Sequence, residues 1–192
     1  MTDTRDNQTY KTIKVGGQWW MSENLNFKSD SSWVYDNAEE NSEKYGRLYN
    51  WASAMTGCPA GWHLPTDEEW MALEIRLGMN EDETERSYWR GNADILGNRL
   101  KAHDQAWGEL TGLPSGFNAV PGGFYKQMVI AFAFKKNKFK DAGLSATYWT
   151  ATPKSKKPKG DAWYRYIDKE NAGIFRGYNY KLHAYAVRCV KD

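Results

Sequence analysis

The sequence predicts a single domain of the α+β class. Its 192 residues suffice to bury one sizeable core but fit two domains less easily. The first half carries strong helix signals, whereas from Leu113 onward glycine, proline and aromatic residues indicate short strands with long connections. No internal repeat divides the chain. We therefore expect residues 1–192 to form one domain, with two early helices, a small twisted antiparallel sheet and long irregular loops.

Aromatic residues make up 15% of the chain and include 10 tryptophans and 12 tyrosines, while leucine and isoleucine are sparse. The core must therefore be built largely from rings. Several rings are also expected near the surface, where tryptophan and tyrosine often carry most of the energy of a binding site.

The first predicted elements are a β-hairpin and an amphipathic helix. Thr9–Leu25 is predicted to be a hairpin because two β-prone runs flank Gly16 and Gly17. Further on, Tyr45–Met55 is predicted to be the first helix. Apolar side chains recur there at helical spacing, namely Leu48, Trp51, Ala52 and Met55.

The strongest local signal lies in Trp62–Trp70, which encodes a strand end, a turn and a helix start. Thr66 and Glu69 are spaced as a capping box, and the three acids at 67–69 suit the positive end of a helix dipole. The second helix is expected to end near Gly78. Its apolar stripe comprises Trp70, Met71, Leu73, Ile75 and Leu77.

Later elements are expected to be short. Short helices are expected between residues 80 and 106, and Trp89, Ile95 and Leu100 are expected to be their buried residues. Met128–Phe134 is apolar and β-prone. Four further strands are predicted: Ala146–Thr152, Ala162–Asp168, Gly173–Tyr178 and Ala184–Val190.

The net charge of +2 conceals an asymmetry between the two halves. Residues 1–100 contain 10 basic and 17 acidic side chains, and residues 101–192 contain 16 and 7. Nine lysines and a single acid, Asp141, lie between Lys126 and Lys159. This segment could attract an anionic surface, but solvated loops explain it equally well. Its lysine-rich stretches lack the arginines with which nucleic-acid-binding proteins make bidentate contacts, so nucleic acid is not the expected partner.

Two cysteines, Cys58 and Cys189, are too few for a zinc or iron–sulfur framework. They form either one disulfide or two buried free thiols. A disulfide closing so long a loop would stabilise the fold by about 4–5 kcal/mol in the chain-entropy model. No apolar run approaches membrane-spanning length and no signal peptide is recognisable, so the chain as given is expected to be soluble.

A catalytic interpretation finds little support. His63, His103 and His183 lie in unrelated contexts without metal-ligand spacing, and His63 is expected to be a hydrogen-bonded framework residue. The acids at 67–69 are explained by their place in the first turn of a helix. We predict no catalytic residue, no metal and no cofactor.

The last third instead predicts a binding patch. Along Ala162–Asp168, two tyrosines and an acid alternate with Trp163, Arg165 and Ile167, so the two sets lie on opposite faces of a strand. A mixture of tyrosine, asparagine and aspartate resembles an antibody paratope. The alternative is that another part of the chain packs over these tyrosines. The predicted ligand-binding residues are Tyr164, Tyr166, Asp168, Asn171, Phe175, Tyr178, Asn179, Tyr180 and His183.

Six segments in this order resemble the Fibrobacter succinogenes major paralogous domain family. They are Tyr10–Gly16, Trp20–Asn26, Tyr45–Trp51, Cys58–Pro65, Tyr148–Thr152 and Val187–Val190. The resemblance implies a C-type-lectin-like fold, of the group that includes formylglycine-generating enzymes, and a bacterial cell-surface or secreted protein, often a lipoprotein. It also implies kinship with the variable proteins of diversity-generating retroelements, whose C-terminal strands and loops display changeable binding residues.

Two departures from related proteins narrow the function. Formylglycine-generating enzymes bind copper through an active-site cysteine pair, whereas Cys58 and Cys189 fall in motifs that resemble framework. Sugar-binding C-type lectins use Glu-Pro-Asn or Gln-Pro-Asp together with Trp-Asn-Asp, and none of these occurs. Trp149–Ala151 occupies the place of the Trp-Asn-Asp motif but lacks the carboxylate that calcium prefers, so calcium-dependent sugar binding is disfavoured.

The sequence therefore predicts a non-catalytic recognition domain of a bacterial surface, secreted or phage protein. It is expected to bind a surface protein or glycan through the C-terminal patch, whose residues a retroelement could diversify. One alternative is an oxidoreductase that resembles the formylglycine-generating enzymes. Another is a structural assembly module, favoured if the tyrosines are buried against a partner chain.

Overall fold

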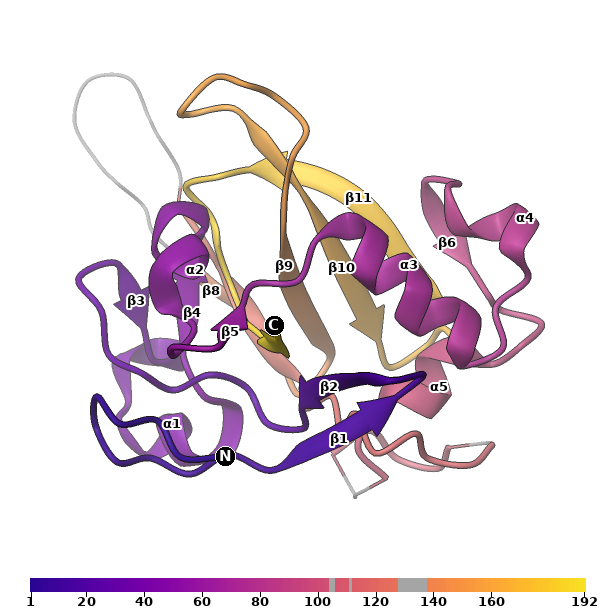
Figure 1. Cartoon of the computed structure of the whole chain (residues 1–192), viewed down its shortest axis with the longest axis horizontal. Helices are drawn as coiled ribbons and strands as arrows, with labels where there is room; N and C mark the ends of the chain where they lie inside the picture. Colours follow the sequence, from indigo (N-terminus) through magenta and orange to yellow (C-terminus); the bar gives the residue numbers. More distant parts are fainter. Residues whose placement is uncertain (104–105, 111, 128–137) are drawn as a thin grey trace.

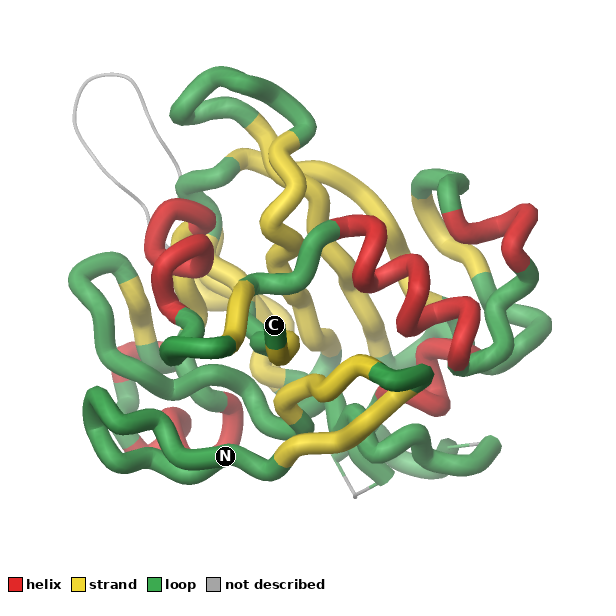
Figure 2. The backbone as a smooth tube through the Cα atoms, in the orientation of Figure 1, coloured by secondary structure: helices red, strands yellow, loops and turns green. Residues whose placement is uncertain are grey.

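The structure is a computed structural model that describes residues 1–103, 106–110, 112–127 and 138–192. Over these residues the protein is mixed α+β, with more strand than helix and with five α-helices, which confirms the predicted class. Helices α2 (Trp51–Gly57) and α3 (Asp67–Arg76) lie on the same side of the larger sheet (Figure 1). Long loops join the elements, as expected (Figure 2).

The larger sheet has nine strands in the described part of the chain and runs in the order β3-β4-β12-β7-β9-β10-β11-β6, with β8 paired to β7. Most pairs are antiparallel, but β7 and β9 are parallel through Gly123 and Ala146. The sheet is thus larger than the small antiparallel one predicted. Its strands are β3 (Ser32–Trp33), β4 (Leu48–Asn50), β6 (Tyr88–Arg90), β7 (Gly122–Lys126), β8 (Lys138–Ala142), β9 (Ser145–Pro153), β10 (Asp161–Asp168), β11 (Ile174–Tyr180) and β12 (Ala184–Tyr185).

A smaller sheet joins the two ends of the chain, in the order β1-β2-β13-β5. Its strands are β1 (Thr12–Val15), β2 (Gln18–Met21), β5 (Trp62–His63) and β13 (Val190–Lys191). The first two form the predicted hairpin, with Val15 paired to Gln18. Cys58 and Cys189 form a disulfide beside this sheet, which settles the choice left open by the sequence.

The predicted strand Ala184–Val190 is wrong as one element, because it divides into β12 and β13, which belong to different sheets. Every residue from Ala184 to Val190 is buried, so this segment has no exposed face. Tyr185, Val187 and Cys189 pack in one buried cluster, whereas Ala184, Ala186 and Val190 pack in another.

Helix α3 begins as predicted. The Glu69 backbone N–H donates to Thr66 Oγ1 at 3.1 Å, and the Thr66 backbone N–H donates to Glu69 Oε2 at 2.8 Å, which completes the capping box. Trp70 and Leu73 are buried and fix the helix to the sheet.

The helix predicted over Tyr45–Met55 is wrong as one element, because after Tyr45 only its second half, from Trp51, is helical. Helix α1 (Glu40–Tyr45) ends at Gly46, whose φ of 69° leaves the helical region, and the next residues form strand β4. Asn50 then caps α2, because its side chain accepts from the Ser53 backbone N–H at 2.9 Å. The helical spacing of the apolar residues therefore spans a strand and a separate helix.

The short helical pieces expected after residue 80 are confirmed in part. Helices α4 (Glu81–Thr84) and α5 (Leu96–Leu100) are present, together with a 3-10 turn earlier in the chain at Tyr35–Asn37. Trp89, however, lies in the edge strand β6, which pairs with β11. The predicted β-prone segment Met128–Phe134 lies outside the described residues.

The core is built from rings, as the composition predicts. The Trp70 ring centroid lies 5.3 Å from that of Trp20, 5.5 Å from that of Phe117 and 5.7 Å from that of Tyr148. All four side chains are buried. None of the helices in the described ranges is long and apolar enough to cross a bilayer.

Candidate functional site

Strands β10 and β11 present two different faces. Tyr166 pairs with Phe175, and Arg165 pairs with Arg176, so like side chains lie side by side across the ladder. Arg165 and Arg176 point toward α3, where both bind Asp67. The predicted alternation along β10 is therefore confirmed, and the tyrosines lie on the opposite face.

The face toward α3 is sealed by buried ion pairs. Arg165 Nη1 lies 2.6 Å from Asp67 Oδ1, Arg165 Nε lies 2.6 Å from Glu74 Oε1, and Arg176 Nη2 lies 2.5 Å from Asp67 Oδ2. Arg90, from β6, also pairs with Glu74 at 2.8 Å. All five side chains are buried. Asp67 was expected only as an acid in the first turn of a helix, and no local pattern indicated that two arginines would enclose it.

These pairs dominate the electrostatics of the sealed face. Burial acts to raise the pKa of Asp67, but Arg176 and Arg165 outweigh it and hold that pKa below its usual value. Burial lowers the pKa of Arg90 to about 10, against the pull of Glu74. Every charge here has a partner within the chain, which marks the face as structural.

The opposite face forms a hollow of about 390 Å³, which we call the aromatic hollow. Six of its ten described lining residues are aromatic, two are aspartates, and none is Lys, Arg or His. They come from seven strands, β6 to β12. The lining residues are Trp89, Phe124, Asp141, Thr147, Tyr164, Tyr166, Asp168, Phe175, Asn179 and Tyr185.

The rings of the aromatic hollow pack against one another in a continuous series. Centroid distances are 5.6 Å between Trp89 and Phe175, 6.0 Å between Phe175 and Tyr164, and 5.3 Å between Tyr164 and Tyr185. Neighbouring planes are tilted by 75°, 32° and 50°, respectively. Such packing fixes each ring and gives the hollow rigid walls.

The phenol groups of the aromatic hollow stay neutral. Burial raises the pKa of Tyr164 to about 12 and raises that of Tyr185 well above its ordinary value. Burial also raises the pKa of Tyr166, with Asp168 adding to the effect. At neutral pH these side chains therefore offer ring surface and hydroxyl hydrogen bonds but no negative charge.

Asp168 closes the turn between β10 and β11. Its Oδ1 accepts from the backbone N–H groups of Glu170 at 3.0 Å and Asn171 at 2.7 Å, and the Asn171 side chain donates to both carboxylate oxygens at 2.9 Å. Asn171 thus lies behind Asp168 and positions it. Asn179 donates to the Tyr185 hydroxyl at 2.8 Å.

The structure divides the predicted patch. Tyr164, Tyr166, Asp168, Phe175 and Asn179 line the aromatic hollow together, and Asn171 supports it. The three remaining predicted residues, Tyr178, Tyr180 and His183, do not line it.

Tyr178 lies on the other face of β11, paired with Trp163, and its exposed fraction is 52%. The rings of Tyr178 and Trp163 meet edge to face at 5.5 Å. The Tyr180 ring instead contacts the buried His183 ring at 6.0 Å. Burial and the nearby Lys126 lower the pKa of His183.

Five lining residues were missed by sequence reasoning, namely Trp89, Phe124, Asp141, Thr147 and Tyr185. All five come from strands other than β10 and β11, and only the pairing of these strands in the sheet brings them to this face. Asp141 offered a signal, because it is the single acid within the lysine-rich segment. The Tyr185 ring is buried and contributes to the floor of the hollow.

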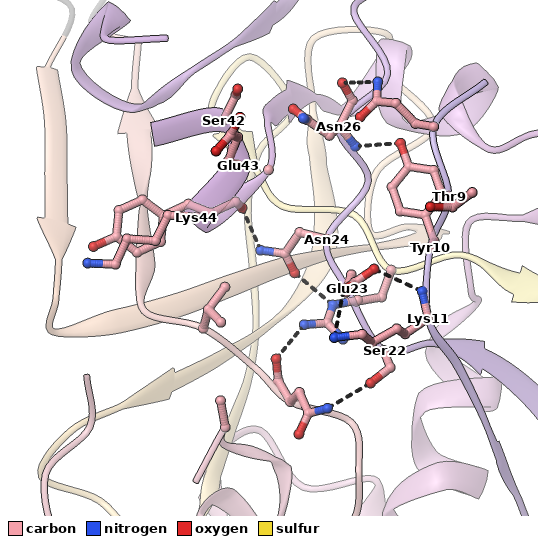
Figure 3. Close-up of a pocket in the computed structure, with 17 residues that line it drawn as sticks. Thr9, Tyr10, Lys11, Ser22, Glu23, Asn24, Asn26, Ser42, Glu43 and Lys44 are labelled. Atoms are coloured by element: carbon pink, nitrogen blue, oxygen red, sulfur yellow. Dashed lines mark hydrogen bonds and ion pairs between the residues drawn. The ribbon is translucent and has the colours of Figure 1, made fainter. Parts of the chain in front are cut away.

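A second pocket of about 500 Å³ lies near the N-terminal segment and helix α1 (Figure 3). Its polar side chains bond mainly to one another: Arg188 Nε donates to Asn24 Oδ1 at 2.7 Å, and Asn118 Nδ2 donates to Ser22 Oγ at 2.8 Å. The Asn26 backbone N–H donates to the Tyr10 hydroxyl at 3.1 Å. These bonds tie distant segments together, so we interpret this pocket as framework.

Metal-binding geometry is not found in the part of the chain that the structure describes, where no group of three His, Cys, Asp or Glu side chains is suitably placed. His63 is hydrogen-bonded, as expected: Nε2 lies 2.9 Å from Glu69 Oε1, and Nδ1 lies 2.5 Å from Asp192 Oδ1. The ring thereby links α3 to the C-terminal residue.

The chain thus combines a mixed-sheet α+β fold with a hollow lined mainly by aromatic rings. The Fibrobacter succinogenes major domain family matches residues 13–191, and the chain belongs to this family. No curated protein and no solved structure matches the chain.

Proposed function

We propose that this protein is a non-catalytic recognition domain that binds a surface protein or a glycan in the aromatic hollow. The observation that carries the proposal is the contrast between two sets of polar groups. The charges under α3 are paired within the chain, whereas rigid rings and two carboxylates line a hollow open to solvent. Aromatic side chains around a concave surface are typical of ligand sites.

The disulfide supports two further parts of this proposal. Because Cys58 and Cys189 bond to each other, they are not a thiolate pair of the kind that formylglycine-generating enzymes use for copper. Disulfides also persist mainly in oxidising compartments, which favours a cell-surface, secreted or virion location. A C-type-lectin-like fold and diversification by a retroelement complete the proposal, and both rest on the family resemblance.

A screen of glycans and bacterial surface proteins against the wild-type protein would identify a ligand. Its affinity should then be measured for the double variant Tyr164→Ala, Tyr166→Ala and for the control Tyr178→Ala, which removes a tyrosine from the opposite face of the same sheet. We expect the double variant to lose about tenfold or more in affinity and the control to retain wild-type binding. Unchanged binding by a folded double variant would refute the proposal.

A further inference from the structure

We propose that the aromatic hollow binds a primary alkylammonium group of the ligand, such as a lysine side chain or an amino sugar carries. This inference rests on the proposed function and specifies the chemistry of the same site. It follows from three properties of the hollow: its ring walls, two carboxylates without a salt bridge and a buried hydroxyl without a hydrogen-bond partner, both judged over the described residues.

The walls suit a cation. Aromatic faces attract positive charge through their quadrupole, and the attraction grows where water is excluded. The protein already uses this contact on the opposite face of the sheet, where the Arg176 guanidinium lies 3.9 Å from the Trp163 ring centroid. The six rings of the hollow carry no such cation among the described residues.

The hollow also carries uncompensated negative charge. Asp141 and Asp168 line it, and neither forms a salt bridge within the described ranges. The buried Lys101 ammonium acts on Asp168 from behind the turn, where it binds Asn98 Oδ1 and Asn171 O at 3.0 Å, but it does not line the hollow. With Lys101 counted, one net negative charge remains.

A buried hydroxyl indicates that the ligand also donates a hydrogen bond. Thr147 is 2% exposed and lines the hollow, and its Oγ1 has no hydrogen-bond partner among the residues that the structure describes. A buried polar atom of this kind is costly unless a ligand or water satisfies it. Thr147 Oγ1, the Asp141 carboxylate and the less engaged Asp168 Oδ2 are acceptors that suit the three N–H donors of a primary ammonium group.

The test compares three probes that differ only at the head group. Nα-acetyl-lysine methylamide carries three N–H donors, its Nε-trimethyl analogue carries the charge without donors, and the norleucine analogue carries neither. Binding is measured by titration with NMR detection. We expect the lysine probe to bind about tenfold more tightly than either analogue. Equal or tighter binding of the trimethyl or norleucine probe, or no binding of the lysine probe, would overturn the proposal.

Three variants locate the interaction. Asp168→Asn keeps an oxygen for the turn but removes the charge, Thr147→Val keeps the shape but removes the acceptor, and Asp30→Asn removes an exposed acid elsewhere. The first two should weaken binding of the lysine probe by about fivefold or more, and the control should not. Glucosamine, tested in parallel, separates an amino-sugar source from a peptide source.

The outcome also separates this inference from the proposed function. If a ligand from the screen binds in the hollow but the lysine probe and glucosamine do not compete with it, the recognition function stands and the ammonium inference fails. If the probe binds in the hollow but the ligand is insensitive to Tyr164→Ala, Tyr166→Ala, the proposed function fails instead.

Discussion

The two faces of β10 and β11 differ in whether their charged side chains are ion-paired within the chain. On the face toward α3, Arg165 and Arg176 are enclosed with the carboxylates of Asp67 and Glu74. On the other face, Asp168 stands among rings at the rim of a hollow, without an ion-pair partner among the described residues. Removing one partner of a buried pair is destabilising, whereas a charge left unpaired at a hollow remains available to a ligand. The difference separates residues that hold the fold from residues that can recognise something outside it.

The largest expected effect comes from a change that leaves both faces in place. The double variant Cys58→Ala, Cys189→Ala removes the covalent link between the end of α2 and the residue that precedes β13. The free energy of unfolding should fall by about 4–5 kcal/mol, because the unfolded chain regains loop entropy. Urea denaturation measures the change. Ligand affinity should be unaltered where the variant is folded, and an unchanged urea midpoint would contradict this account of the link.

Breaking the sealed face should cost nearly as much. Asp67→Ala leaves Arg165 and Arg176 buried without their shared carboxylate, and we expect a loss of about 3–5 kcal/mol in unfolding free energy. The matched change on the other face, Asp168→Asn, should cost less than about 1 kcal/mol because that carboxylate is partly exposed and the amide keeps an acceptor. If urea denaturation shows equal losses of unfolding free energy for Asp67→Ala and Asp168→Asn, the two faces do not differ in their contribution to stability.

Trp89 extends the comparison to the edge strand β6, whose residues alternate between the two faces. Arg90 pairs with Glu74 on the sealed side, whereas Trp89 contacts Tyr166 and Phe175 in the hollow. Trp89→Ala should lower ligand affinity by about tenfold and stability by about 1–2 kcal/mol, since the ring is only half-buried. Calorimetric titration with the ligand checks the first effect. If Trp89→Ala binds the ligand with wild-type affinity, strand β6 does not contribute to the binding site.

The smallest expected effect concerns His63, which lies away from both faces. Burial acts to lower its pKa, but hydrogen bonds to Asp192 and Glu69 outweigh burial and raise that pKa above its usual value. A raised folded-state pKa stabilises the protein below about pH 6.5, and the contribution is lost as the pH rises through the folded-state value. The stability lost in His63→Gln should therefore be larger at about pH 5 than above neutrality. If the difference in unfolding free energy between the wild type and His63→Gln does not change with pH, the pKa of His63 is not raised in the folded state.

Local signals predicted the parts of the fold that depend on neighbours in sequence. The capping box at Thr66 and Glu69 needs only residues three positions apart, and the alternation along β10 needs only a regular strand. The same alternation also distinguishes two residues of the predicted patch. Phe175 and Tyr178 are an odd number of positions apart, so a regular strand points their side chains to opposite faces of the sheet.

Other features depend on partners distant in the sequence. Leu48 fits a helical pattern, but pairing of β4 with β3 and β12 makes its segment a strand. The burial of Asp67 requires Arg165 and Arg176, about a hundred residues later. Trp89 and Asp141 reach the hollow only through the pairing of β6 with β11 and of β8 with β7. No local pattern in the chain records these contacts.

Whether the hollow serves a ligand or the fold is decided by measuring unfolding free energy and ligand affinity for two variants, Asp67→Ala and the double variant Tyr164→Ala, Tyr166→Ala. We expect the tyrosine variant to lose about tenfold or more in affinity with the smaller loss of stability, and Asp67→Ala to lose more stability while its folded fraction keeps wild-type affinity. The reverse pattern, with full binding by the tyrosine variant and a greater loss of stability, would show that the hollow serves the fold and not a ligand.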